Sequence, residues 1–220
     1  MDRITFETAD GLALEGELRR PDGAPRGAAV LCHAHPLHGG SKDHPLLWAL
    51  RIELARRGLV VLSFNFRGVM GSEGEHGGGV AEVADVEAAV GRVRREAGGP
   101  VLVCGWSFGA HVALRAALGD ERIGALALLG FPLTELSLLV PLLPSPEALA
   151  ALRRPVLFVA GEADPFSPVP ELKELARKLP HATVAVVKGT DHFFPRRERD
   201  AARLVGSFAE RVLLPAGENR

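Results

Sequence analysis

The chain has 220 residues, of which 47% are hydrophobic and 24% charged, and these are ordinary values for a globular protein. Its formal net charge of −1 argues against nucleic acid or an anionic membrane as the main partner. No apolar run reaches the roughly 18 residues of a membrane-spanning helix, and the charged N-terminal segment is unlike a signal peptide. We therefore expect a cytoplasmic protein that forms one domain over residues 1–220.

The only two cysteines, Cys32 and Cys104, each end an apolar run. A disulfide between them is possible, but cytosolic proteins rarely keep disulfides. We expect two buried thiols.

The turn signals and apolar runs predict a β-hairpin followed by alternating strands and helices. Residues 4–8 and 12–19 alternate in polarity on either side of Ala9-Asp10-Gly11, in which Asp-Gly is a strong hairpin signal. Further strands are expected at 27–32, 59–64, 101–104, 123–129, 156–160 and 183–187. Helices are expected from 45 to near 58 and at 80–96, 110–118, 169–179 and 196–213, with one or two helical turns at 146–152.

In the last of these helices, Leu204, Phe208 and Val212 follow a helical period and are predicted to face inward. The tail at 215–220 is expected to fray. Strands that alternate with helices predict a mostly parallel, doubly wound sheet of eight strands with helices on both faces. In such a sheet, functional sites form beyond the carboxyl ends of the strands.

The motif that indicates chemistry is Gly105-Trp106-Ser107-Phe108-Gly109, between a predicted strand and a predicted helix. A Gly-x-Ser-x-Gly turn in this context lifts the serine hydroxyl above the end of a sheet, with the serine backbone strained. Side chains in place of Gly105 or Gly109 would collide with the returning helix. Ser107 is therefore the candidate nucleophile.

Two later loops at the same edge of the sheet offer partners for Ser107. Asp164 follows the strand at 156–160, and His192 follows the strand at 183–187. His192 could take the serine proton and return it to the leaving group, while Asp164 would hold the imidazole by its other N–H. Glu162 and Asp191 are less favoured rivals for the acid.

A serine hydrolase also needs two backbone N–H groups aimed at the developing oxyanion. Phe108, which follows the nucleophile, is predicted to supply one. The second is expected from the turn after the strand at 27–32, where Pro36 has no N–H. Leu37 is the preferred candidate and His35 is the alternative.

These stretches resemble the small bacterial α/β-hydrolases of the dienelactone-hydrolase-like group. The resemblance implies an α/β-hydrolase fold and an esterase-type serine hydrolase that acts through an acyl-enzyme. Residues 130–154 are too few for the multi-helix cap of many lipases, which suggests an open site. The matching motifs are His33-Ala34-His35-Pro36-Leu37-His38-Gly39-Gly40, Phe64-Asn65-Phe66-Arg67-Gly68-Val69, Gly105-Trp106-Ser107-Phe108-Gly109, Gly161-Glu162-Ala163-Asp164 and Asp191-His192-Phe193-Phe194.

The predicted reaction is therefore hydrolysis of a small-molecule carboxylic ester or thioester, without cofactor or metal, by a monomer or homodimer. His35, His38 and Trp106 are possible substrate contacts. One alternative is a metal-dependent hydrolase that uses His33, His35 and His38. The other is a non-catalytic binding or regulatory protein on the same scaffold.

Two further residues are predicted to have structural roles. Arg67 is expected to tie down the loop that follows its strand, and His111 is expected to be a packed helix residue.

Overall fold

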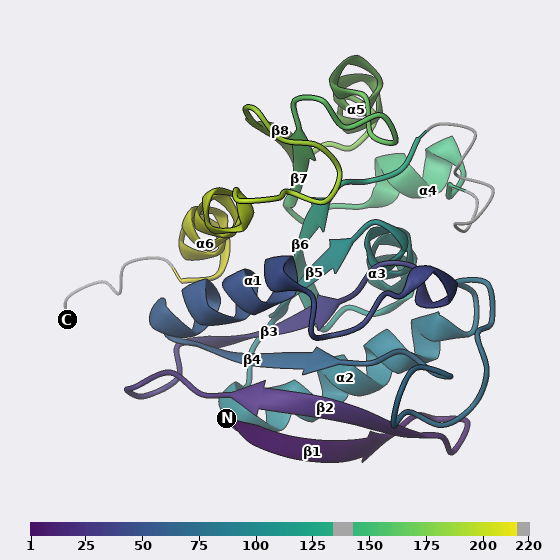
Figure 1. Cartoon of the computed structure of the whole chain (residues 1–220), viewed down its shortest axis with the longest axis vertical. Helices are drawn as coiled ribbons and strands as arrows, with labels where there is room; N and C mark the ends of the chain where they lie inside the picture. The colour runs from purple at the N-terminus through teal and green to yellow at the C-terminus, as the bar shows by residue number, and fades with distance from the viewer. Residues whose placement is uncertain (134–142, 215–220) are drawn as a thin grey trace.

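The computed structural model, which describes residues 1–133 and 143–214, contains an eight-stranded sheet in the order β1-β2-β4-β3-β5-β6-β7-β8 (Figure 1). Strand β2 runs antiparallel to both of its neighbours, β1 and β4, and the six strands from β4 to β8 are parallel to one another. The predicted sheet is confirmed. The strands are β1 (Asp2–Glu7), β2 (Ala13–Arg19), β3 (Gly27–Cys32), β4 (Leu59–Phe64), β5 (Val101–Trp106), β6 (Ile123–Leu129), β7 (Val156–Gly161) and β8 (Ala182–Val187).

Helices cover both faces of this sheet, as predicted (Figure 1). Helices α1 and α6 pack on one face, and α2, α3, α4 and α5 pack on the other. Because both faces are covered, the central strands β4 and β5 are buried along their whole length. The helices are α1 (Pro45–Arg56), α2 (Glu82–Ala97), α3 (Phe108–Gly119), α4 (Pro146–Ala151), α5 (Val169–Ala176) and α6 (Glu198–Leu213).

The opening hairpin forms as predicted, but its connection is a five-residue loop at 8–12 rather than the three residues Ala9-Asp10-Gly11. Glu7 pairs with Ala13, and the hydroxyl of Thr8 accepts the N–H of Leu12 at 3.0 Å. Gly11 has a φ of 84°, which favours glycine at that position.

The predicted inward face of α6 is wrong at Leu204, whose side chain is 36% exposed. Phe208 is buried as predicted, and Val212 is only half-buried. The helix approaches α1 so closely that a Cβ on Gly206 would lie 2.5 Å from Arg57 Nε. This close approach requires a glycine at position 206, and the buried residues of α6 are Ala201, Ala202, Val205, Gly206, Phe208 and Ala209.

Arg67 fastens the segment after β4 to two other parts of the fold. Its guanidinium donates to Asp85 of α2 at 2.7 and 2.9 Å, and to Asp10 of the hairpin loop at 2.8 and 3.2 Å. Its backbone N–H also donates to Asp85, at 2.9 Å. Arg67 is buried, so the prediction of a structural role is confirmed.

The connection between β6 and β7 contains α4, where one or two helical turns were predicted. The hydroxyl of Ser145 caps this helix by accepting the N–H of Ala148 at 3.2 Å. No multi-helix cap is present in the described part of this connection, at 130–133 and 143–154. Residues 134–142 and the tail at 215–220, where fraying was expected, lie outside the described residues.

The cysteines are free and buried, as predicted. Burial raises the pKa of both thiols, which keeps them in the unreactive protonated form. In the part of the chain that the structure describes, no helix has the length and apolar character needed to cross a bilayer.

Candidate active site

Ser107 lies at a sharp turn between β5 and α3, with a φ of 55° and a ψ of −118°. A positive φ is strained for a residue with a side chain and is held here by the surrounding contacts. A Cβ on Gly105 would lie 2.3 Å from the carbonyl oxygen of Gly109, so the strand and the helix need glycine there. At Gly109 the obstacle is different from the predicted one, because a Cβ would lie 2.5 Å from the carbonyl oxygen of Cys32 in β3.

The structure brings His192 and Asp164 to Ser107, in one hydrogen-bonded chain. His192 Nε2 lies 3.0 Å from Ser107 Oγ, and His192 Nδ1 lies 2.9 Å from Asp164 Oδ2. Both His192 and Asp164 are buried. We assign the ring proton to Nδ1, because this nitrogen faces a carboxylate, which leaves Nε2 to accept the serine hydroxyl.

Asp164 is itself held by its own loop. Its Oδ1 accepts the backbone N–H groups of Phe166 and Ser167 at 2.9 and 3.1 Å. These bonds fix the carboxylate that orients the His192 ring.

The rival carboxylates have other partners. Glu162 accepts the N–H of Gly189 at 3.0 Å, and Asp191 accepts the N–H of Phe193 at 3.0 Å. Among the described residues, the carboxylate that hydrogen-bonds His192 is therefore that of Asp164.

Gly130, at the end of β6, is a site residue that sequence reasoning missed. Its φ is 49°, and a Cβ there would lie 3.1 Å from His192 Nδ1 and Cε1 and 3.4 Å from Asp164 Oδ2. The lack of a side chain makes room for the His192–Asp164 pair. A glycine at the carboxyl end of a predicted strand was the available signal.

A cavity of about 350 Å³ opens above Ser107. Its described lining contains no Asp, Glu, Lys or Arg, so it suits uncharged groups. The predicted substrate contacts His35, His38 and Trp106 all line it. Besides Ser107 and His192, the lining residues are Ala34, His35, His38, Gly39, Gly40, His44, Trp106, Pro132, Phe166 and Phe193.

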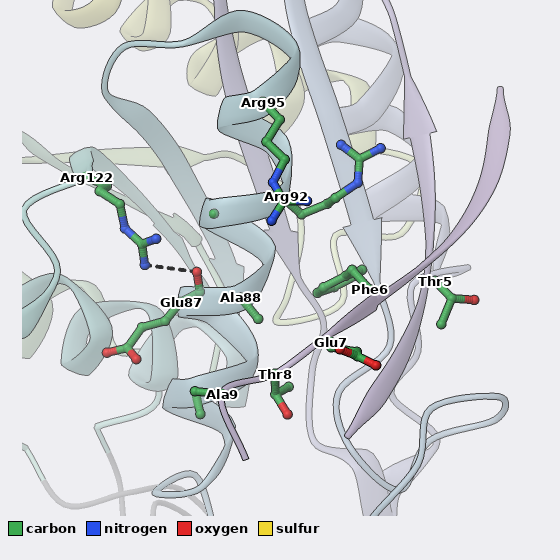
Figure 2. A pocket seen from close by; sticks show the side chains of 12 residues that line it. Thr5, Phe6, Glu7, Thr8, Ala9, Glu87, Ala88, Arg92, Arg95 and Arg122 are labelled. Atoms are coloured by element: carbon green, nitrogen blue, oxygen red, sulfur yellow. Dashed lines mark hydrogen bonds between the residues drawn. The ribbon is translucent and has the colours of Figure 1, made fainter. Parts of the chain in front are cut away.

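A larger cavity of about 550 Å³ lies elsewhere, between β1 and α2, and three arginines line it (Figure 2). Arg92 pairs with Glu96 at 2.9 Å, and Arg122 pairs with Asp120 at 2.7 Å. Because Arg92 and Arg122 are already paired, and Ser107 is absent from the lining of this larger cavity, we place the site at the smaller cavity.

In the turn after β3, the N–H of Leu37, the preferred oxyanion donor, has another partner. The N–H of Leu37 donates to His35 Nδ1 at 3.2 Å, and its side chain is 73% exposed. Leu37 does not line the cavity, whereas His35 and His38 do. The short 3-10 helix at Pro36–His38 causes this arrangement, because His35 caps it with its own ring.

His33 is held in its neutral form beneath this turn. Its Nε2 accepts the N–H of Phe66 at 3.0 Å, so Nδ1 carries the proton and donates to the Ala34 carbonyl at 2.6 Å. Burial lowers the pKa of His33 to about 4. With both ring nitrogens occupied, His33 has no lone pair left for a metal ion.

The described residues contain no donor set that matches the metal-dependent alternative. Among the described residues, no group of three or more His, Cys, Asp or Glu side chains is arranged to hold a metal ion. His44 caps α1 by accepting the N–H of Leu46 at Nδ1, at 3.2 Å, and burial lowers its pKa.

His111, on α3, has the predicted packing role. Its ring is buried and stacks on Phe131 with centroids 4.0 Å apart, and its Nε2 lies 2.9 Å from the carbonyl oxygen of Pro132. It thus supports the start of the segment after β6.

Several known proteins resemble this chain in sequence and fold. An uncharacterized protein of Rickettsia prowazekii (strain Madrid E) is 25% identical, over 94% of this chain and 88% of its own. An alpha-beta serine hydrolase homologue from Coxiella burnetii is 26% identical with a TM-score of 0.79, over 94% of this chain and 96% of its own. A lidless alpha/beta serine hydrolase from Xanthomonas campestris is 26% identical with a TM-score of 0.81, over 99% and 96%.

These likenesses support hydrolase activity. A model of the alpha/beta hydrolase domain matches residues 27–212, which is well over half of the chain. The protein belongs to the alpha/beta hydrolase domain family.

Proposed function

We propose that this protein is a serine hydrolase that cleaves carboxylic esters or thioesters of small acyl groups through an acyl-Ser107 intermediate. The observation that carries the proposal is the hydrogen-bonded chain in which His192 lies 3.0 Å from Ser107 Oγ and 2.9 Å from Asp164. A serine hydroxyl is a weak nucleophile on its own, and a base at this distance activates it.

In the first half of the reaction, His192 Nε2 takes the hydroxyl proton as Ser107 Oγ attacks the carbonyl carbon of the substrate. Asp164 stabilises the imidazolium that results. When the tetrahedral intermediate collapses, the same proton passes from Nε2 to the leaving alcohol or thiol. In the second half, His192 activates a water molecule that attacks the acyl-enzyme, and the carboxylic acid leaves.

The negative charge on the tetrahedral intermediate needs donors, and the N–H of Phe108 is one candidate. Phe108 is the first residue of α3, where backbone N–H groups have no partner within the helix. For the second donor we propose the backbone N–H of His35 in place of Leu37. Pro36 has no N–H, and that of Leu37 donates to the His35 ring.

The cavity supports a small and uncharged acyl group. Its volume of about 350 Å³ lies toward the lower end for small-molecule sites, and apolar and aromatic side chains make up much of its lining. His35, His38 and Trp106 are the proposed substrate contacts.

The test is hydrolysis of a chain-length series of p-nitrophenyl esters and acyl thioesters by the wild type and by Ser107→Ala. Wild-type turnover should favour short acyl chains, and the variant should lose about 10³-fold or more in kcat. The wild type, and not the variant, should also be labelled by a fluorophosphonate. Equal rates for the two proteins would refute the nucleophile. Activity that EDTA abolishes and the fluorophosphonate leaves intact would favour the metal alternative, and no turnover with no labelling would favour the binding protein.

A further inference from the structure

Trp106 joins the two halves of the site through its side chain. Its indole Nε1–H donates to the backbone carbonyl of His192 at 3.1 Å. The two residues are 86 positions apart in the chain, and both are buried. The bond is therefore a long-range contact in a dry environment, where a hydrogen bond is worth more than at the surface.

The donor end of this bond belongs to the rigid frame that carries the nucleophile. Trp106 is the last residue of β5, which is buried between β3 and β6, and Ser107 follows it directly. The indole contacts the tilted ring of His44, the α1 cap, with centroids 4.1 Å apart, and meets the Phe193 ring edge-on at 6.1 Å. These contacts leave the indole little freedom to turn.

The acceptor end lies in the loop that follows β8, at the edge of the sheet. His192 follows β8, an edge strand with a neighbour on one side only. Two residues just beyond it, Phe194 and Arg196, have positive φ values of 55° and 62°, which are strained for residues with side chains. Asp164 holds the His192 ring, but a ring held by its tip can still shift if its backbone moves.

We propose that Trp106 is a positioning residue for His192, and that its indole N–H keeps His192 Nε2 within reach of Ser107 Oγ. This inference rests on the proposed function of Ser107 and His192. It assigns Trp106 a second role beside that of cavity wall, and the two roles need different chemical groups. The wall needs an aromatic surface, whereas the tether, the indole bond to the His192 carbonyl, needs a hydrogen-bond donor.

Trp106→Phe separates the two roles, because it keeps an aromatic side chain and removes the donor. The His192 carbonyl then becomes a buried acceptor without its partner, and the loop is free to move. We expect kcat for the p-nitrophenyl ester to fall about tenfold, which is the effect of one hydrogen bond, while KM changes by less than about threefold. Trp48→Phe is the matched control: Trp48 is half-exposed on α1, and the variant should keep the wild-type kcat.

A more specific experiment replaces Trp106 with β-(3-benzothienyl)alanine, in which sulfur takes the place of the N–H. Trp48 is the only other tryptophan, so a Trp48→Phe background confines the replacement to position 106. Here the shape of the wall is retained, and the same tenfold loss in kcat with unchanged KM is expected. A loss confined to KM, or a wild-type kcat in both replacements, would overturn the proposal.

A readout that needs no turnover distinguishes this proposal from the proposed function. In wild type and in Ser107→Ala, the Trp106 indole N–H should exchange slowly with solvent, and the His192 ring signals should be sharp in NMR spectra. In Trp106→Phe the His192 signals should shift and broaden. If the wild type proves inactive but these spectral changes occur, the proposed function fails and the tether stands; unchanged His192 signals would refute the tether whatever the activity.

Discussion

Lowering the pH from 7 to 5 should destabilise the folded protein through one buried side chain, His33. It lies directly after β3, below the turn that borders the cavity. Both of its ring nitrogens are engaged by backbone groups, at Phe66 and Ala34. Since Nε2 accepts an N–H, a proton added there would break that bond and place a charge in a site with no exposed surface.

The size of the effect follows from the difference between the folded and unfolded pKa values. Burial lowers the pKa of His33 from 6.5 to about 4. Above pH 6.5 the ring is neutral in both states, and stability is fully present. As the pH falls below 6.5, His33 binds a proton in the unfolded chain but not in the folded protein, so the free energy of unfolding declines until about pH 4. At about 1.36 kcal/mol per pKa unit, the decline is about 3 kcal/mol in total and about 2 kcal/mol between pH 7 and pH 5.

Urea denaturation at pH 7 and pH 5 measures this loss, provided that other titrating groups are subtracted. His33→Gln supplies the reference, because a glutamine amide offers a donor and an acceptor but does not titrate in this range. The change in unfolding free energy between the two pH values should be about 2 kcal/mol smaller in His33→Gln than in the wild type. His181→Gln removes an exposed histidine and should leave the change as in the wild type. An equal loss in wild type and His33→Gln would refute the reasoning.

Two further substitutions test contacts around the site and the hairpin. Gly130→Ala should lower kcat at least tenfold while the protein stays folded, because the new methyl group would displace the His192 ring. Gly189→Ala is the control. Gly189 also has a positive φ, but a Cβ there would meet no atom within 4 Å, so this variant should retain the wild-type kcat. Arg67→Met should reduce the unfolding free energy by about 3–5 kcal/mol, because it leaves the buried carboxylate of Asp85 without its ion pair. Burial already raises the pKa of Asp85. In urea denaturation, adding Asp85→Asn should recover part of that loss, and a fully additive double variant would contradict this explanation.

The strand and helix order was readable from local patterns, because periodicity and turn residues act over a few positions. The same holds for Ser107, since the Gly-x-Ser-x-Gly turn is a local backbone requirement. Asp164 and His192 could be placed on neighbouring loops because parallel strands bring their carboxyl ends to one edge of the sheet. The structure then brings these two side chains into hydrogen-bond distance of one another and of Ser107.

Predictions that depended on the direction of a single side chain or N–H were less successful. Leu204 follows the helical period of α6 as well as Val205 does, and only the close approach to α1 decides which of the two is buried. The N–H of Leu37, the oxyanion donor preferred from the sequence, donates to the His35 ring.

The order of the elements, the sharp turn at Ser107 and the loops that carry its partners follow from local sequence, because each depends on residues close together in the chain. The roles of Gly130, which makes room for His192, and of Trp106, which holds the His192 backbone, follow only from the packed fold. These contacts join residues more than 60 positions apart. Their geometry depends on how the strands and helices pack, which no local pattern records.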